Sequence, residues 1–262
     1  MSTTYDRHES QRRSEKLHHP KCLRPRSESV GNQTTEPSER LSTPAGYPIE
    51  VYVEGTVGAG KSTLLEGIKM LLKGTADVFP EPVHDWENVL VRFYKDPAST
   101  ALALQLRVLT SFFGRGDDSE AQIKIFERSP LATRNVFGEM LLEDDLMHPD
   151  DAITFNRIYE NSFRWKQRFQ FCIFVHVDVE ESMRRVEKRS RKDDADIKEE
   201  YLMRLHKQYM KFVVIRDLET LRSTGMTWAV SPHFKKVIAI DGTRPKEEIA
   251  RLAVKAINMF LQ

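Results

Sequence analysis

The segment that most constrains the fold is the glycine-rich stretch Gly55-Thr56-Val57-Gly58-Ala59-Gly60-Lys61-Ser62. It matches the phosphate-binding pattern G-x-x-x-x-G-K-[ST]. Residues 49–53, just before it, alternate apolar and polar side chains and predict a short strand. Apolar residues at helical spacing follow as far as Lys73-Gly74 and predict a helix. The pattern therefore lies in the strand–loop–helix context that it requires.

The residue types of this stretch suit the binding of a phosphate chain. Glycines let backbone N–H groups approach phosphate oxygens without interference from a Cβ, and the helix N-terminus adds partial positive charge. Lys61 supplies a full charge, and the Ser62 hydroxyl can ligate magnesium. We expect a nucleoside triphosphate to bind here. The expected binding residues are Gly55, Thr56, Val57, Gly58, Ala59, Gly60, Lys61, Ser62 and Thr63.

Composition argues against several other classes of protein. The chain has 262 residues and a formal net charge of +1, which gives no electrostatic reason to expect nucleic acid or a membrane surface as partner. The two cysteines, Cys22 and Cys172, are too few for a disulfide framework and favour a reducing compartment. No apolar run is long enough to cross a bilayer, and the polar start of the chain predicts no secretory signal. We expect a cytoplasmic location, with mitochondria as the second choice.

The first 46 residues differ in composition from the rest. They are rich in Ser, Thr, Arg, Glu and Pro, and such a segment cannot bury enough apolar surface to offset its ordering entropy. Its basic residues alone would suit a targeting or nucleic-acid-binding tail, but acidic residues are interleaved with them. We expect a disordered tail over residues 1–46 and one folded domain over residues 47–262.

Strands and helices alternate along that domain. Besides residues 49–53, strands are predicted at residues 77–80, 122–126, 171–177 and 236–240. Strands separated by helices imply right-handed crossovers and a parallel sheet, so we predict an α/β fold with three αβα layers around five parallel strands. Ligands of such sheets bind beyond the carboxyl ends of the strands. The glycine loop, Glu81 and Glu127 all fall there, which predicts one shared site.

Several motifs occur in an informative order. Glu81-Pro82-Val83-His84-Asp85-Trp86 follows the second strand and Glu127-Arg128-Ser129-Pro130 follows the third, with Tyr94-Lys95-Asp96-Pro97 between them. Arg-x-Arg and Tyr201-Leu202 come later. Together with the glycine loop, these motifs resemble those of the deoxyribonucleoside kinase family over roughly residues 48–215. Their pattern is most similar to the mitochondrial-type thymidine kinases and the insect multisubstrate enzyme.

The resemblance implies a P-loop kinase with a helical lid. Such an enzyme uses ATP and Mg²⁺ to phosphorylate the 5′-hydroxyl of a small-molecule deoxynucleoside for nucleotide salvage, and it is usually a homodimer.

Three charged residues are assigned to the chemistry. Glu81 at a strand end can take the proton of the attacking hydroxyl, a contribution of roughly 10²–10⁴-fold in rate. By resemblance Arg128 holds the 5′-oxygen and Glu127 lies on the magnesium side with Ser62. The alternatives are that Glu81 is a solvated loop residue and that Glu127–Arg128 is an ordinary ion pair at a strand end.

Four further residues are assigned to the nucleoside. Trp86 and Tyr94 alone would be read as core aromatics, but the resemblance places Trp86 along the base and Tyr94 on the sugar 3′-hydroxyl. Gln105 lies in an apolar helix, and its amide offers both the donor and the acceptor that the edge of a pyrimidine requires. Phe137 matches the position that stacks on the other face of the base.

A basic run covers residues 184–192. By itself it would be a solvated helix face, but by resemblance it leads into the lid, with Arg189 and Arg191 stabilising transition-state charge. Asp194 then matches a position at which the family usually has a glutamate that contacts the 3′-hydroxyl. Because aspartate is one methylene shorter, this contact can be lost or bridged by water.

Two neutral residues bear on the choice of base. Members that prefer cytidine or purines pair an arginine with an aspartate, and the matching positions here are Phe112 and Thr133. This argues for thymidine or a broad pyrimidine range. Two alternatives remain, a nucleoside monophosphate kinase and a non-catalytic nucleotide-binding regulator. Residues 222–234 match no pattern that we can interpret.

Overall fold

The computed structural model describes residues 48–163, 171–189 and 197–262. The tail expected at residues 1–46 lies outside these ranges, as do two residues expected in the lid, Arg191 and Asp194.

The described residues form a seven-stranded sheet with the strand order β2-β3-β1-β4-β7-β6-β5. Its first five strands in that order are parallel, as predicted. The prediction of five strands in all is wrong, because β5 and β6 pair antiparallel and extend the sheet beyond β7. The strands are β1 Ile49–Glu54, β2 Ala76–Phe79, β3 Ile123–Glu127, β4 Phe171–His176, β5 Val214–Ile215, β6 Met226–Val230 and β7 Lys236–Asp241.

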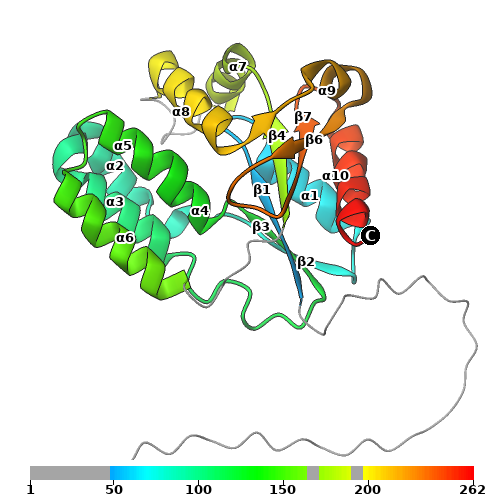
Figure 1. Ribbon diagram of the computed structural model, residues 1–262, viewed down its shortest axis with the longest axis horizontal. Coiled ribbons are helices and arrows are strands. Elements are labelled where there is room, and N and C mark those ends of the chain that lie inside the picture. The colour runs from blue at the N-terminus through cyan, green and yellow to red at the C-terminus, as the bar shows by residue number, and fades with distance from the viewer. Residues whose placement is uncertain (1–47, 164–170, 190–196) are drawn as a thin grey trace, which may run out of the picture. The chain divides into compact units, whose positions relative to one another are not determined.

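Helices cover both faces of the sheet (Figure 1). Those with eight or more residues are α1 Lys61–Leu71, α2 Glu87–Lys95, α3 Pro97–Thr110, α6 Pro149–Phe163, α7 Val179–Arg189, α8 Glu199–Phe212 and α10 Lys246–Phe260. The shorter ones are the 3₁₀ turn η2 Val83–Asp85, α4 Pro130–Ala132, the π-helical segment η3 Thr133–Gly138, α5 Glu139–Glu143 and α9 Leu218–Thr224.

The core has one cluster on each face of the sheet because the inner strands are buried on both sides. On one face, Val51 and Val53 of β1 pack with α1 and α10. On the other, Tyr52 of β1 and Phe174 of β4 pack with α6, α8 and the start of the α4–η3 run. The expected three-layer αβα arrangement is therefore confirmed.

A group of helices lies beside the sheet and forms one wall of the site. Phe93 of α2, Leu104 of α3, Leu141 of α5 and Ala152 of α6 share a small core of their own. Figure 1 shows these helices together on the left. The π-helical segment η3 contacts α3 and α5 of this group, and its Val136 belongs to the core cluster that includes Tyr52 of β1. Such segments often occur at functional sites.

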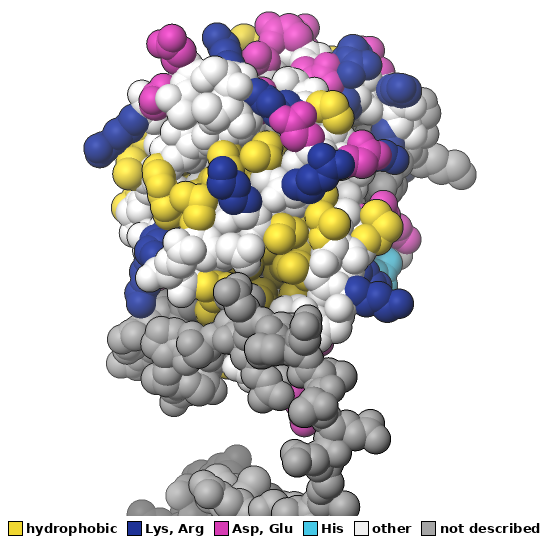
Figure 2. All heavy atoms as spheres, turned by 90° about the vertical axis from the view of Figure 1, so that its right-hand side faces the viewer, with side chains coloured by type: hydrophobic (Ala, Val, Ile, Leu, Met, Phe, Trp, Pro, Cys, Tyr) yellow, Lys and Arg dark blue, Asp and Glu magenta, His cyan; other side chains and the backbone are white. Residues whose placement is uncertain are grey.

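Basic and acidic side chains are interspersed on the face that Figure 2 shows, so this face has no patch of one charge sign. Among the described residues, no helix has both the length and the apolar character needed to cross a bilayer.

Candidate active site

The glycine loop joins the end of β1 to the start of α1, as predicted. Gly58 and Gly60 have φ angles of 80° and 94°, in the left-handed region that favours glycine. A Cβ on Gly58 would lie 2.6 Å from the carbonyl oxygen of Ser182, so this position also has no room for a side chain. The backbone therefore adopts a conformation that only glycine accommodates easily. Helix α1 begins directly after this loop, with Gly60 as its N-cap.

Lys61 is buried at the base of this loop. Its Nζ donates to the carbonyl oxygens of Gly55 at 3.2 Å and Thr56 at 3.0 Å. Burial, together with the nearby charge of Arg128, lowers the pKa of Lys61 to about 8. The charged form of Lys61 is therefore disfavoured in the ligand-free site, and the negative oxygens of a phosphate chain would stabilise it.

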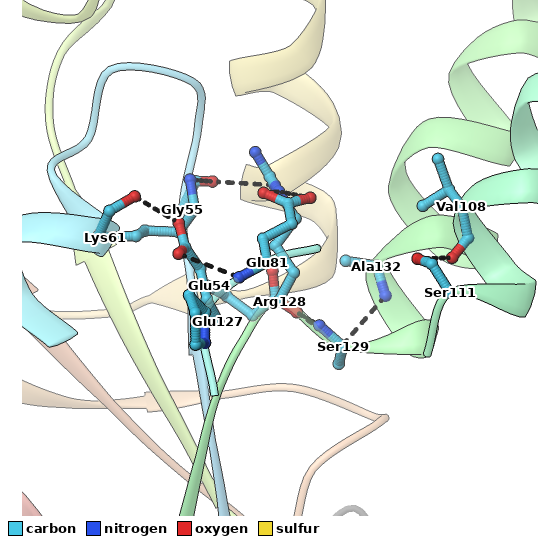
Figure 3. A network of polar contacts seen from close by, with 12 residues as sticks. Glu54, Gly55, Lys61, Glu81, Val108, Ser111, Glu127, Arg128, Ser129 and Ala132 are labelled. Atoms are coloured by element: carbon cyan, nitrogen blue, oxygen red, sulfur yellow. Dashed lines mark hydrogen bonds and ion pairs between the residues drawn. The ribbon is translucent and has the colours of Figure 1, made fainter. Parts of the chain in front are cut away.

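Glu81 and Arg128 meet at the carboxyl ends of two adjacent strands, β2 and β3. The Nε of Arg128 lies 2.9 Å from both carboxylate oxygens of Glu81 (Figure 3). Burial opposes the charge of Arg128, but Glu81 and other anionic groups raise its pKa above the usual range. Arg128 also has a φ angle of 61°, unusual for a residue with a side chain. Sequence reasoning therefore identified two residues that the fold brings into direct contact.

Glu127 connects the glycine loop to Glu81. Its Oε1 accepts from the Ser62 hydroxyl at 2.9 Å, and its Oε2 accepts from the backbone N–H of Glu81 at 3.3 Å. No group of three or more His, Cys, Asp or Glu side chains in the described residues could hold a metal ion. The pair of oxygens on Ser62 and Glu127 nevertheless fits Mg²⁺, which commonly takes one or two protein oxygens and completes its shell with phosphate and water.

A cavity of about 940 Å³ extends from the glycine loop to the helices beside the sheet. Most of the predicted site residues line it together: Val57, Gly58, Ala59, Gly60, Lys61, Ser62, Thr63, Glu81, Trp86, Tyr94, Gln105, Glu127, Arg128, Phe137 and Arg189. Gly55 and Thr56 are not lining residues but contribute the carbonyl groups that hold Lys61.

Two residues that line this cavity each carry a buried polar atom with no hydrogen-bond partner among the described residues. The Oε1 atom of Gln105 and the Nε1 atom of Trp86 are buried and form no hydrogen bond. Such atoms are rare in folded proteins because leaving them unpaired is costly. Both belong to residues that we expected at the nucleoside, and a polar ligand bound beside them is one source of the missing partners.

The two residues matched to the base pocket lie in different places in the structure. Thr133 lines the cavity, but Phe112 does not. Phe112 follows the end of α3 and is buried in the core, where the guanidinium carbon of Arg115 lies 5.2 Å from the centre of its ring. Val108, one helical turn earlier, lines the cavity in its place.

Sequence reasoning also missed three polar residues behind the site. Arg115 donates to the backbone carbonyls of Phe79, Pro80 and Glu127, at the ends of β2 and β3. Glu54 and Tyr209 lie behind Arg128 and have no exposed surface. The one available signal was Glu54, a charged residue at the end of an otherwise buried strand.

The fold and site define a P-loop phosphotransferase whose cavity extends from the phosphate loop to the helices beside the sheet. Residues 51–255 match the family model described as deoxynucleoside kinase. The chain belongs to the deoxynucleoside kinase family and is a kinase, as the motifs indicated.

Comparison with individual proteins agrees. The chain is 28% identical to protein 143R of Invertebrate iridescent virus 6, over 80% of this chain and 97% of that one. It is 29% identical to deoxyadenosine kinase of Dictyostelium discoideum, over 62% of this chain and 66% of the relative. The structure of deoxyadenosine kinase from M. mycoides with bound dCTP superimposes with a TM-score of 0.63 at 24% identity, covering 80% of this chain and all of that one, which supports the fold.

Proposed function

We propose that this kinase transfers the γ-phosphoryl group of ATP to the 5′-hydroxyl of a pyrimidine deoxynucleoside, for nucleotide salvage. The observation that carries the proposal is the position of the Glu81–Arg128 pair. It lines the same cavity as the phosphate loop on one side and Trp86, Gln105 and Phe137 on the other. A carboxylate at this junction can meet a hydroxyl that points towards a bound triphosphate.

The proposed reaction assigns a task to each charged group. The 5′-oxygen attacks the γ-phosphorus and its proton passes to the Glu81 carboxylate. The bond from the γ-phosphorus to the bridging oxygen breaks, and ADP leaves with the electron pair. Arg128 holds the 5′-oxygen and the charge that develops beside it, and Lys61 neutralises charge on the phosphates. Bound Mg²⁺, with Ser62 and Glu127 as its protein ligands, would neutralise further phosphate charge.

We expect the adenosine of ATP, the phosphoryl donor, at the end of the cavity away from Glu81. There, Gly242, Arg244 and Lys246 line the wall. Arg185 joins this wall to the glycine loop, since its guanidinium donates to the carbonyl oxygens of Ala59 at 3.1 Å and Gly242 at 2.7 Å. Because the acceptor side is already defined by Glu81, this end is the remaining space for the adenosine of ATP.

The pyrimidine preference rests on the residues around the acceptor cavity. The Oε1 atom of Gln105 has no hydrogen-bond partner in the described part of the chain, and an amide can pair with both a donor and an acceptor of thymine or cytosine. Neighbouring Val108 and Thr133 are neutral, so the described cavity has no arginine–aspartate pair beside the base. A purine substrate is the alternative, because one relative is named for deoxyadenosine.

The test is ATP-dependent phosphorylation of thymidine, deoxycytidine, deoxyadenosine and deoxyguanosine, compared by kcat/KM. We expect the highest value for thymidine or deoxycytidine. A higher value for a purine would overturn the pyrimidine assignment and leave the kinase reaction intact. Turnover of none of the four would contradict the proposed reaction, and phosphorylation of a nucleoside monophosphate instead would move the acceptor from a hydroxyl to a phosphate.

A further inference from the structure

The Arg128 side chain is held from two directions. Glu81 binds its Nε, as described above, and the Nη1 atom donates to the hydroxyl of Tyr209 at 2.6 Å. Within the described part of the chain, Nη1 has one other hydrogen bond, a long one of 3.4 Å to the carbonyl oxygen of Gly55. Tyr209 belongs to α8, far from β3 in the sequence, and is fully buried. The orientation of Arg128 therefore depends on a contact with a distant helix.

Glu54 completes this arrangement from behind. Its Oε2 accepts from the Tyr209 hydroxyl at 3.1 Å. Its Oε1 accepts from the backbone N–H of Ser129 at 2.8 Å and from the Ser129 hydroxyl at 2.6 Å. Ser129 is the residue after Arg128, so these contacts form a closed ring from the Arg128 side chain through Tyr209, Glu54 and Ser129 back to the Arg128 backbone (Figure 3 shows Glu54, Arg128 and Ser129).

The donors and acceptors of this ring match only one assignment. An arginine can only donate, so the Tyr209 oxygen accepts from it and has its own proton left for Glu54. Burial raises the pKa of Tyr209 well above its usual value, so the hydroxyl keeps that proton. Burial also raises the pKa of Glu54, while Arg128 and the hydrogen bonds from Ser129 and Tyr209 lower it. Because Arg128 has a φ angle of 61°, the ring also fixes a backbone that would otherwise relax.

We propose that Tyr209 and Glu54 are positioning residues that fix Arg128 in the orientation that phosphoryl transfer requires. Neither lines the cavity, so neither is expected to touch the nucleoside or the triphosphate. This inference rests on the proposed role of Arg128. Its consequence is specific: loss of the tyrosine hydroxyl should lower kcat more than it changes either KM, because bound substrates keep their contacts while the guanidinium loses its alignment.

The test uses Tyr209→Phe, which removes one oxygen and keeps the ring. We expect kcat to fall about tenfold or more, with KM for the nucleoside and for ATP changed less than about twofold. In an Arg128→Ala background, Tyr209→Phe should produce no further loss of kcat, because the residue that it positions is gone. A merely structural role would lower kcat by the same factor in both backgrounds.

Tyr159→Phe is the matched control. Tyr159 is also a buried tyrosine beside an arginine, with the guanidinium carbon of Arg134 5.1 Å from the centre of its ring, but it does not line the cavity. It should leave kcat unchanged. Glu54→Gln perturbs the same closed set of hydrogen bonds at a second position. It should also lower kcat more than it changes either KM.

Three results would overturn the proposal: an unchanged kcat in Tyr209→Phe, an equal loss in Tyr159→Phe, or additive losses in the Arg128→Ala background. Each is measured relative to an active wild-type enzyme on its best nucleoside. Absence of activity in the wild type would instead count against the proposed function itself.

Discussion

Arg128 and Glu81 come from adjacent parallel strands, and the Nε of the arginine lies 2.9 Å from both oxygens of the glutamate. In the register of the sheet, Phe79 pairs with Phe126, so the residues just beyond these strands emerge at the same edge. A proton acceptor and a fixed cation are thereby placed together, beside the loop that is suited to a triphosphate. This relationship gives the site its chemistry, and the predictions below test the groups that support it.

The buried Lys61 should make stability depend on pH. Its folded-state pKa of about 8 lies below the usual 10.5 of lysine, so between these values the unfolded chain binds more protons than the folded one. Stability from this group therefore rises as pH increases from 8 towards 10.5. Relative to Lys61→Met, the ligand-free wild type should gain roughly 1–2 kcal/mol between pH 7.5 and 9.5, measured by urea unfolding. A difference between the two proteins that does not change with pH would contradict the burial of this charge.

Arg115 should stabilise the strand ends that carry Glu81 and Arg128. Arg115→Met leaves several backbone carbonyls without their charged donor, so we expect the free energy of unfolding to fall by about 2–4 kcal/mol. Arg107→Met is the control, because Arg107 is exposed and donates to a single carbonyl, that of Asp85, at 2.8 Å. Its cost should stay within about 0.5 kcal/mol. Equal losses in the two variants would show that the contacts of Arg115 carry no special weight.

Gln105 should contribute to substrate binding while adding nothing to the stability of the ligand-free enzyme. Because its Oε1 is buried without a partner among residues 48–163, 171–189 and 197–262, Gln105→Met should leave the melting temperature of the ligand-free enzyme unchanged or higher. The same variant should lower kcat/KM for the preferred nucleoside about 10- to 100-fold. Gln208→Met is a useful comparison, since this buried glutamine already donates to Glu143 and should lose stability without a change in KM. A wild-type kcat/KM in Gln105→Met would remove Gln105 from the binding site.

Local patterns predicted the parallel part of the fold. All five predicted strands exist to within about two residues at each end, because apolar runs bounded by turns and helices report burial directly. The residues that follow β2 and β3 could be assigned to a shared site because parallel strands end at one edge of the sheet. The motifs around Glu81 and Arg128 then identified the family.

What could not be predicted depends on contacts across the chain. The antiparallel strands β5 and β6 were missed. β5 has only two residues, and β6, with Trp228 at its centre, lies in the segment 222–234 that matched no pattern, although it pairs with β7 directly after it. The bond between Tyr209 and Glu54 joins residues 155 positions apart, and neither belongs to the motifs used. Whether Phe112 lines the cavity also depends on how α3 packs, and its side chain lies in the core with Leu109 and Phe126.

The most direct test of the account is phosphoryl transfer by Glu81→Gln. The amide is nearly isosteric with the carboxylate but cannot accept the proton of the attacking hydroxyl. We expect kcat to fall roughly 10²–10⁴-fold, while the Kd for ATP, measured by calorimetry, stays within about twofold of wild type because the phosphate loop is untouched. A wild-type kcat in this variant would contradict the assignment of Glu81 as the base, and with it the central claim about this site.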